Sequence, residues 1–321
     1  MNVSVLGCGR WGSFLGWYMD SIGHKVTQWG METEYSYRIL KDTGRNEYVR
    51  LSPSIHLTSD LQEAVESADI IIISISSQGL DGFSKRVKEY DVSEKKFVLC
   101  MKGIETSTGR RLSQILIENG FDPENIAVWV GPGHIQDFVA GIPNCMVIDS
   151  YNPELRHYLV KKFDGDLIRF YYGNDIIGNE IGAAAKNVIG IAAGMLDGLG
   201  LGTLKGPLMA RGALEVSYYI GASGGKPQSA FGLAHLGDYE TTLFSKHSNN
   251  RRFGEMFVRG EKFDKLAEGV YTSEAMVRMA KKFKLEMPIT EVVYETIYKK
   301  KDPREEVLKL FKRSRKYEFE I

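Results

Sequence analysis

The sequence predicts an α/β protein with two domains: a doubly wound, mostly parallel sheet at residues 1–174 and an all-α domain at residues 175–321. Three observations support this fold class. A short apolar run ends in a glycine-rich turn at residues 7–12, segments typical of strands and helices alternate up to about residue 174, and strand-like runs stop after that point. Alternating β and α elements are typical of a parallel sheet with helices on both faces.

The first expected strand, residues 3–6, leads directly into Gly7-Cys8-Gly9-Arg10-Trp11-Gly12, and residues 13–21 after it have helical spacing. This is the strand, Gly-x-Gly-x-x-Gly and helix order of a Rossmann-type dinucleotide site. Gly7 would form the tight turn, Gly9 would let backbone N–H groups reach a pyrophosphate, and Gly12 would let the helix pack closely on the strand. The chain holds 34 glycines, so the alternative is a glycine-rich turn that binds nothing.

The rest of the first domain continues the alternation. Residues 70–75 hold five isoleucines, which is typical of a parallel strand buried on both faces. Further strands are expected at 25–29, 96–101, 126–130, 145–148 and 167–172, with helices at 61–67, 80–89, 111–118 and 153–163. The loops after strand carboxyl ends should meet along one edge of such a sheet; these loops are 7–12, 74–79, 102–105 and 131–137.

The second domain reads as helices throughout. They are expected at 179–199, 207–221, 249–259, 272–283, 288–298 and 303–312. The domain boundary leads straight into the first of these helices, so we expect a well-formed cleft between the domains, where ligands commonly bind.

Composition excludes several classes of protein. Lys+Arg and Asp+Glu both number 41, so no overall field favours nucleic acid or an anionic membrane. The three cysteines are widely spaced, without the pattern of a metal site or a disulfide framework, which indicates a reducing compartment. We recognise no signal peptide and no apolar run long enough to span a bilayer. We therefore expect a cytoplasmic protein that binds no metal.

Two lysines are candidates for chemistry. Lys186 lies in a helical run of small residues, 182–188, where desolvation should lower its pKa and let it exchange a proton with a carbonyl oxygen. The alternative is a lysine that extends from a buried helix to water. Lys102 follows an expected strand at the sheet edge, where it would hold a substrate oxygen or phosphate; the alternative is an ordinary strand-end lysine.

Two loop segments and one acid complete the candidate site. Gly131 and Gly133 would let backbone N–H groups face a ligand. Residues 248–254 begin a helix with two arginines in its first turn, an unfavourable position that a bound anion would relieve. The alternative is a pair of solvated arginines bonded to Glu255 or Glu240. Asp238 is the one acid in a neutral stretch and could orient Lys186 or a substrate hydroxyl.

In this order, the motifs resemble the bacterial NAD(P)-dependent glycerol-3-phosphate dehydrogenases over essentially the whole chain. They include Gly-x-Gly-x-Trp-Gly (7–12), Lys-Gly-Ile-Glu (102–105), Gly-Pro with a later Ala-Gly-x-Pro (131–143), Ala-Lys-Asn-Val through Gly-Leu-Gly (185–202), Asn-Arg-Arg-Phe-Gly (250–254) and Met-Pro-Ile-Thr (287–290).

The resemblance implies a cytoplasmic oxidoreductase, a homodimer, that interconverts dihydroxyacetone phosphate and sn-glycerol 3-phosphate with NAD or NADP for glycerophospholipid synthesis. It implies that Lys186 is the proton donor and acceptor, with Lys102 and Asp238 beside it. The implied substrate residues are Lys102, Gly131, Gly133, Lys186, Asn187, Asp238, Thr242, Ser248, Asn249 and Asn250. The implied cofactor residues are Gly7, Gly9, Arg10, Trp11, Gly12, Met31, Lys102, Ile135, Asn249, Arg251 and Glu268.

The chain departs from the family pattern in the segments expected to bind substrate and cofactor. The family usually has an arginine that holds the substrate phosphate where this chain has Asn249, so Arg251 or Arg252 would have to replace it. The loop at 131–136 also differs from the usual Gly-Pro-Ser/Thr-Phe-Ala. The segment around Met31, after the second expected strand, lacks the basic or histidine residue that the family usually has there, and no acid lies directly at the strand end. The sequence therefore does not decide between NAD and NADP. Two alternatives stay open: a related reductase of another small keto or hydroxy compound, and a non-catalytic dinucleotide sensor.

Overall fold

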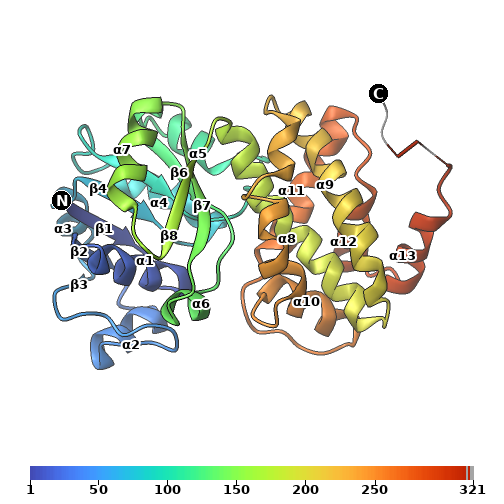
Figure 1. Ribbon diagram of the computed structural model, residues 1–321, viewed down its shortest axis with the longest axis horizontal. Coiled ribbons are helices and arrows are strands. Elements are labelled where there is room, and N and C mark those ends of the chain that lie inside the picture. The colour runs from blue at the N-terminus through green and yellow to red at the C-terminus, as the bar shows by residue number, and fades with distance from the viewer. Residues whose placement is uncertain (316, 319–321) are drawn as a thin grey trace.

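The structure is a computed structural model that describes residues 1–315, 317 and 318. Residues 316 and 319–321 of the expected second domain lie outside the described residues. Figure 1 shows two lobes side by side, one built on a sheet and one built of helices. This agrees with the predicted fold class, a Rossmann-type α/β lobe followed by an all-α lobe.

In the described residues, the sheet has eight strands in the order β3-β2-β1-β4-β5-β6-β7-β8. All neighbouring pairs are parallel except β6 with β7, which are antiparallel. The chain order reverses between β1 and β4, which is where open α/β sheets bind ligands. The strands are β1 (Asn2–Leu6), β2 (Lys25–Trp29), β3 (His56–Thr58), β4 (Ile70–Ile73), β5 (Lys96–Leu99), β6 (Ile126–Val130), β7 (Asn144–Ser150) and β8 (Ile168–Tyr172).

The central strands end level with one another. Leu6 pairs with Trp29 on one side and with Ile73 on the other, and Ile73 pairs in turn with Leu99. The loops that follow these four residues therefore leave the sheet at one edge. Because these strands end at the same level, the loops that carry the candidate site residues lie next to one another.

Alternate residues of the strands face two separate apolar layers, because successive side chains of a strand point to opposite faces. Ile70 and Ile72 join the layer under α1 and α7, whereas Ile71 and Ile73 join the layer under α3, α4 and α5. The helices of this lobe are α1 (Arg10–Ser21), α2 (Tyr35–Thr43), α3 (Leu61–Glu66), α4 (Leu80–Val87), α5 (Leu112–Glu118), α6 (Ile135–Val139) and α7 (Pro153–Phe163).

Three short elements were not predicted. Helix α2 buries only Tyr37 and Leu40, so its apolar face is too small to give a clear helical pattern. Strand β3 has only three residues, too few for an alternation. Helix α6 begins at Ile135, inside the segment expected as a loop at 131–137, and is a single short turn.

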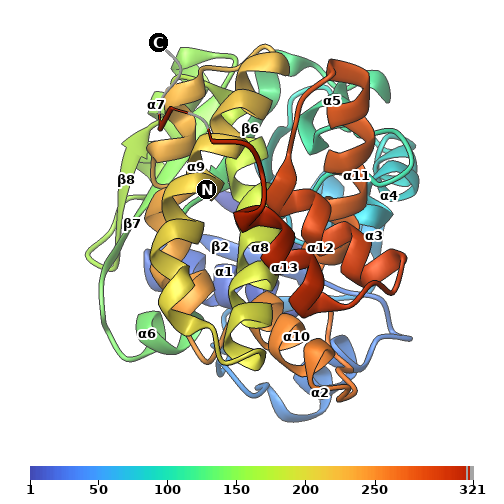
Figure 2. The ribbon, with the colours of Figure 1, turned by 90° about the vertical axis from the view of Figure 1, so that its right-hand side faces the viewer.

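The helical lobe is built around α8. Nearly every residue of this helix is buried, and α9, α10, α11 and α12 surround it (Figure 2). The close approach of α10 depends on glycine: a Cβ at Gly194 would lie 1.9 Å from the Arg251 carbonyl oxygen, and one at Gly254 would lie 2.1 Å from the Ile191 oxygen. The helices are α8 (Ile176–Gly198), α9 (Lys205–Ala222), α10 (Asn249–Val258), α11 (Glu268–Phe283), α12 (Pro288–Tyr298) and α13 (Pro303–Phe311).

The segment between α9 and α10 is irregular and passes over α8. It contains a 3₁₀ turn at Leu236–Asp238 and a π-helical turn at Glu240–Phe244. Such π turns occur often at functional sites. We propose the domain boundary between residues 174 and 175, because β8 ends at Tyr172 and α8 begins at Ile176. Among the helices that the structure describes, none is long and apolar enough to cross a membrane.

Candidate functional site

The turn after β1 needs glycine at two positions for steric reasons. Gly7 has φ +129°, and a Cβ there would lie 2.2 Å from the Ser74 oxygen. A Cβ at Gly12 would lie 2.0 Å from the Gly7 oxygen. At Gly9, by contrast, no atom of the described residues outside its own neighbourhood lies within 4 Å of an added Cβ. Gly9 thus faces open space in front of the N-terminus of α1, where backbone N–H groups point toward a ligand.

A cleft of about 550 Å³ opens at this turn, between the loops of the sheet lobe and helices α8 and α10. It gathers residues that are far apart in the sequence. Of the predicted site residues, those that line it are Gly7, Gly9, Arg10, Trp11, Lys102, Gly133, Ile135, Lys186, Asn187, Thr242, Ser248, Asn249, Asn250 and Glu268.

The two candidate lysines meet at one carboxylate. The Lys186 Nζ and the Lys102 Nζ each lie 2.8 Å from Oδ2 of Asp238. Lys186 also donates to Oγ1 of Thr242 at 2.8 Å, and Lys102 donates to the Gly131 carbonyl oxygen at 2.7 Å. Lys186 is 8% exposed and Asp238 1% exposed, so Lys186 does not extend to bulk water.

Burial and the neighbouring charges together set the protonation of Lys186 and Asp238. Burial lowers the pKa of Lys186 to about 8; Asp238 opposes this shift and Lys102 adds to it. Burial alone would raise the pKa of Asp238, but the two ammonium groups outweigh it and lower that pKa below its usual value. Asp238 therefore stays ionised at neutral pH, while Lys186 can gain or lose a proton near it.

A chain of side-chain amides joins both lobes behind the lysines. The Asn187 amide donates to the Lys102 carbonyl oxygen at 2.9 Å, and the Asn250 amide donates to Oδ1 of Asn187 at 3.0 Å. The N–H of Gly269 donates to Oδ1 of Asn250 at 2.9 Å. These bonds fix the starts of α10 and α11 against α8 and the loop after β5.

Five predicted residues do not line the cleft. Asp238 and Gly131 contact its lysines from behind, and Gly12 supports the turn. Met31 is 39% exposed and lies outside the lining residues. Arg251 is also outside, because its guanidinium pairs with Glu255 at 2.7 Å and with Asp197 at 3.2 Å.

Arg251 therefore fits the alternative of arginines paired with a neighbouring acid better than it fits an anion site. Its backbone N–H donates to Ser248, which caps α10. Arg252 turns its guanidinium over the ring of Phe263, 5.9 Å from the ring centroid. The expectation that one of these two arginines would hold a phosphate is not supported by either placement.

The cleft also holds buried polar atoms that need a partner. Nε1 of Trp11, Nε2 of His134 and Oε2 of Glu268 have no hydrogen-bond partner among the described residues. Buried polar atoms without a hydrogen-bond partner are rare in folded proteins, and a bound ligand can supply the missing partner. Together with the open space at Gly9, they fit a bound dinucleotide. In the described part of the chain, no group of three or more His, Cys, Asp or Glu residues could hold a metal ion.

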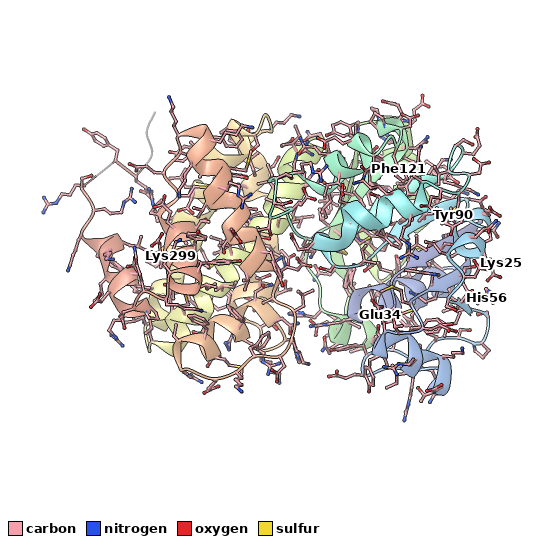
Figure 3. All side chains as sticks on the ribbon, turned by 180° about the vertical axis from the view of Figure 1, so that it is seen from behind. Lys25, Glu34, His56, Tyr90, Phe121 and Lys299 are labelled. Carbon is pink, nitrogen blue, oxygen red and sulfur yellow. The ribbon has the colours of Figure 1, made fainter. Side chains whose placement is uncertain are left out.

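Sequence reasoning missed several lining residues. Glu34 and Ser36 come from the loop and helix after β2, and His247 comes from the segment before α10. Figure 3 shows Glu34 on the sheet lobe, well away from Lys299 on the helical lobe. His134 also lines the cleft, where burial, Arg10 and Lys186 lower its pKa to about 4. No local sequence pattern marked Glu34 or His247, because loop folding brings both to the cleft.

The doubly wound sheet, the glycine turn and the buried lysine pair define the class of dinucleotide-dependent oxidoreductases. Family models for the N-terminus and C-terminus of NAD-dependent glycerol-3-phosphate dehydrogenase match residues 2–156 and 175–308. The chain belongs to the NAD(P)-dependent glycerol-3-phosphate dehydrogenase family.

Individual relatives and a solved structure match this chain over almost their whole length. A glycerol-3-phosphate dehydrogenase (NAD(P)+) of Thermoanaerobacter sp. (strain X514) is 33% identical over 99% of each chain. The enzyme of the same name from Moorella thermoacetica is 35% identical over 99% of this chain and 98% of its own. The crystal structure of glycerol-3-phosphate dehydrogenase from Coxiella burnetii has a TM-score of 0.90 at 28% identity, covering 97% of this chain and 99% of that chain.

Proposed function

We propose that the protein reduces dihydroxyacetone phosphate to sn-glycerol 3-phosphate reversibly, with NADH or NADPH as the reductant. The observation that carries this proposal is the buried Lys186 ammonium beside Asp238, in a cleft that begins at the dinucleotide turn. The family membership supports the same substrate pair. When bound, the nicotinamide cofactor supplies the hydride.

Lys186 is the proposed proton donor. As C2 of the ketone is reduced, its oxygen gains negative charge, and an ammonium group in a dry cleft stabilises that charge and then protonates it. A pKa of about 8 keeps most of Lys186 charged at neutral pH yet lets it release the proton readily. In the reverse direction the neutral amine accepts the proton of the hydroxyl.

Lys102 and Asp238 have supporting roles in this proposal. Lys102 would hold the same substrate oxygen or its neighbour, because both ammonium groups meet at one carboxylate. Asp238 would fix the two amines and keep Lys186 protonated more often than burial alone would allow. Thr242 would orient the Lys186 amine through their 2.8 Å hydrogen bond.

The remaining lining residues would bind the two ligands. The proposed substrate contacts are Gly133, Asn187, Ser248, Asn249 and Asn250, and Gly131 would act through Lys102, whose amine donates to its carbonyl oxygen. The proposed cofactor contacts are Gly7, Gly9, Arg10, Trp11, Ile135, Asn249 and Glu268, with Gly12 supporting the turn. Met31 and Arg251 are left out, because they lie outside the cleft.

We also propose that the protein acts in the cytoplasm, as a homodimer, to supply the glycerol backbone of phospholipids. The widely spaced cysteines, which show no disulfide pattern, support a reducing compartment. The dimer rests on analogy with other two-domain dehydrogenases. Size-exclusion chromatography with light scattering would test it.

One assay tests the central proposal. Oxidation of NADH and of NADPH would be followed after addition of dihydroxyacetone phosphate to the purified protein. Rapid oxidation is expected with at least one of them.

A second candidate, a reductase of another small ketone, is favoured by the neutral Asn249 in the cleft. Higher kcat/KM with a 2-keto acid or a 3-hydroxy acid than with the phosphate esters would select that second candidate.

A further inference from the structure

The positively charged side chains of the cleft differ in whether a carboxylate pairs with them. Three cationic side chains line it: Arg10, Lys102 and Lys186. Both lysines lie 2.8 Å from Asp238. Arg10, by contrast, forms no ion pair with a carboxylate among the described residues. A guanidinium left without a counterion in a partly enclosed cleft favours an anionic ligand.

Arg10 reaches across the cleft from the start of α1 to the opposite wall. Its Nη1 donates to the His247 carbonyl oxygen and its Nη2 to Oε1 of Gln136, both at 3.2 Å. The guanidinium also lies 5.2 Å from the centroid of the Tyr48 ring. These contacts hold the group in one position, and a guanidinium has more N–H donors than the two that are used here. The free donors can bind an anion without rearrangement.

His134 adds a second free donor or acceptor at the same end. Its Nε2 is buried and unpartnered among the described residues, and its ring lies 5.7 Å from the ring of His247. Arg10 and Lys186 both lie close enough to lower the pKa of this imidazole, which favours its uncharged form. An uncharged imidazole can donate one hydrogen bond to a phosphate oxygen.

Apart from Lys186, the proposed proton donor, no cationic side chain among the described residues of the helical lobe lines the cleft. Asn249 is neutral, and its amide donates to the Leu266 carbonyl oxygen at 3.2 Å. Arg251 pairs with Asp197 and Glu255, and Arg252 covers Phe263. With Lys186 placed at the reacting carbonyl, the remaining charge that would hold a phosphate comes from the sheet lobe.

We propose that Arg10, which the family resemblance assigns to the cofactor, instead binds the phosphate group of the substrate together with His134, with the reacting carbonyl at Lys186. This inference rests on the proposed function, because it assumes a phosphate ester as substrate. The shared chemistry, an anionic phosphate, is also present in the pyrophosphate of the cofactor. The experiment must therefore separate the two phosphates.

The test compares two binding constants in one variant. In Arg10→Ala, the KM for dihydroxyacetone phosphate and the calorimetric Kd for sn-glycerol 3-phosphate should rise about 10- to 100-fold. The Kd for NAD+ alone should change less than the Kd for the phosphate ester. His134→Phe should raise the same KM by a smaller factor. A rise in the Kd for NAD+ with an unchanged substrate KM would assign Arg10 to the pyrophosphate and overturn the proposal.

A double variant guards against a merely structural effect. Asn249→Arg should restore much of the substrate affinity in the Arg10→Ala background, because it supplies a guanidinium from the facing helix start. Arg252→Ala is the matched control and should leave the KM unchanged; a rise there, without one in Arg10→Ala, would refute the assignment. If the unmodified protein does not reduce dihydroxyacetone phosphate, the proposed function fails. If it does and Arg10→Ala has the same KM, only this inference fails.

Discussion

The amine of Lys186 and the carboxylate of Asp238 form a buried ion pair whose acceptor oxygen is shared: Oδ2 lies 2.8 Å from Lys186 and 2.8 Å from Lys102. Two cations therefore compete for one anion. This arrangement holds both amines in the cleft, and it leaves the three groups with a net positive charge where a ketone oxygen would become negative.

Replacing Lys186 by methionine should remove turnover and leave the fold in place. Methionine fills a similar volume, and Asp238 keeps Lys102 as its partner. We expect kcat to fall by about 10²- to 10⁴-fold, the range for loss of a general acid. Steady-state kinetics would measure kcat, and circular dichroism would confirm folding.

Lys205 provides a matched control for that substitution. It is buried on α9 and pairs with Asp197 at 2.7 Å, outside the cleft. Lys205→Met should reduce the thermal stability and keep kcat. Similar kcat losses in both variants would mean that the effect of Lys186 is structural.

The rates of the two directions should depend on pH in opposite ways. Reduction needs the ammonium form of Lys186, so kcat/KM for dihydroxyacetone phosphate should fall as pH rises through about 8. Oxidation of glycerol 3-phosphate needs the neutral amine and should rise over the same interval. Asp238→Asn removes a charge that raises the pKa of Lys186, so both transitions should move to lower pH. Transitions that do not move would argue against this pairing.

The glycines of the turn should separate stability from binding. Gly12→Ala places a Cβ 2.0 Å from the Gly7 oxygen and should lower the stability by about 1–3 kcal/mol. Gly9→Ala meets no described atom within 4 Å and has an ordinary φ of −67°, so its Tm should change little. Its methyl group would instead project into the space proposed for the cofactor. Thermal denaturation and the Kd for NADH would distinguish the two effects.

Glu34 should favour NADH over NADPH. It lines the cleft beyond the end of β2, where an acid binds the ribose hydroxyls of NAD and repels a 2′-phosphate. Its carboxylate is close enough to Cys8 to raise the pKa of that thiol, although burial is the larger cause of the shift. We expect the Kd for NADPH to exceed that for NADH by about tenfold or more.

Charge removal tests that preference. Glu34→Gln should narrow the ratio of the two Kd values, measured calorimetrically without substrate. Glu32→Gln is the control, because Glu32 pairs with Lys41 outside the cleft. Equal ratios in the unmodified protein and in Glu34→Gln would exclude a role for this carboxylate.

The sequence was sufficient for seven of the eight described strands, for the helical lobe and for the expectation that Asp238 lies beside Lys186, for identifiable reasons. Lys186 stood out as a charge among small residues, and Asp238 as a lone acid in a neutral stretch; both are local signals. Arg251 could not be placed, because its pairing with Asp197 depends on how α10 packs against α8. Glu34 and His247 were missed for a similar reason: loop folding, not spacing, brings them to the cleft.

The contact of Gly194 with α10 links architecture to reactivity. Helix α8, which fills the middle of the helical lobe, also carries the Lys186 amine. Along the side that faces α10 it has no room for an added side-chain carbon at Gly194. One extra carbon at Gly194, more than two turns from Lys186, would push α10 away from α8 and disturb the hydrogen bond between Asn250 and Asn187 beside the proposed proton donor. The steric fit between these two helices therefore bears on the proposed catalytic site, although neither Gly194 nor Arg251 lines the cleft.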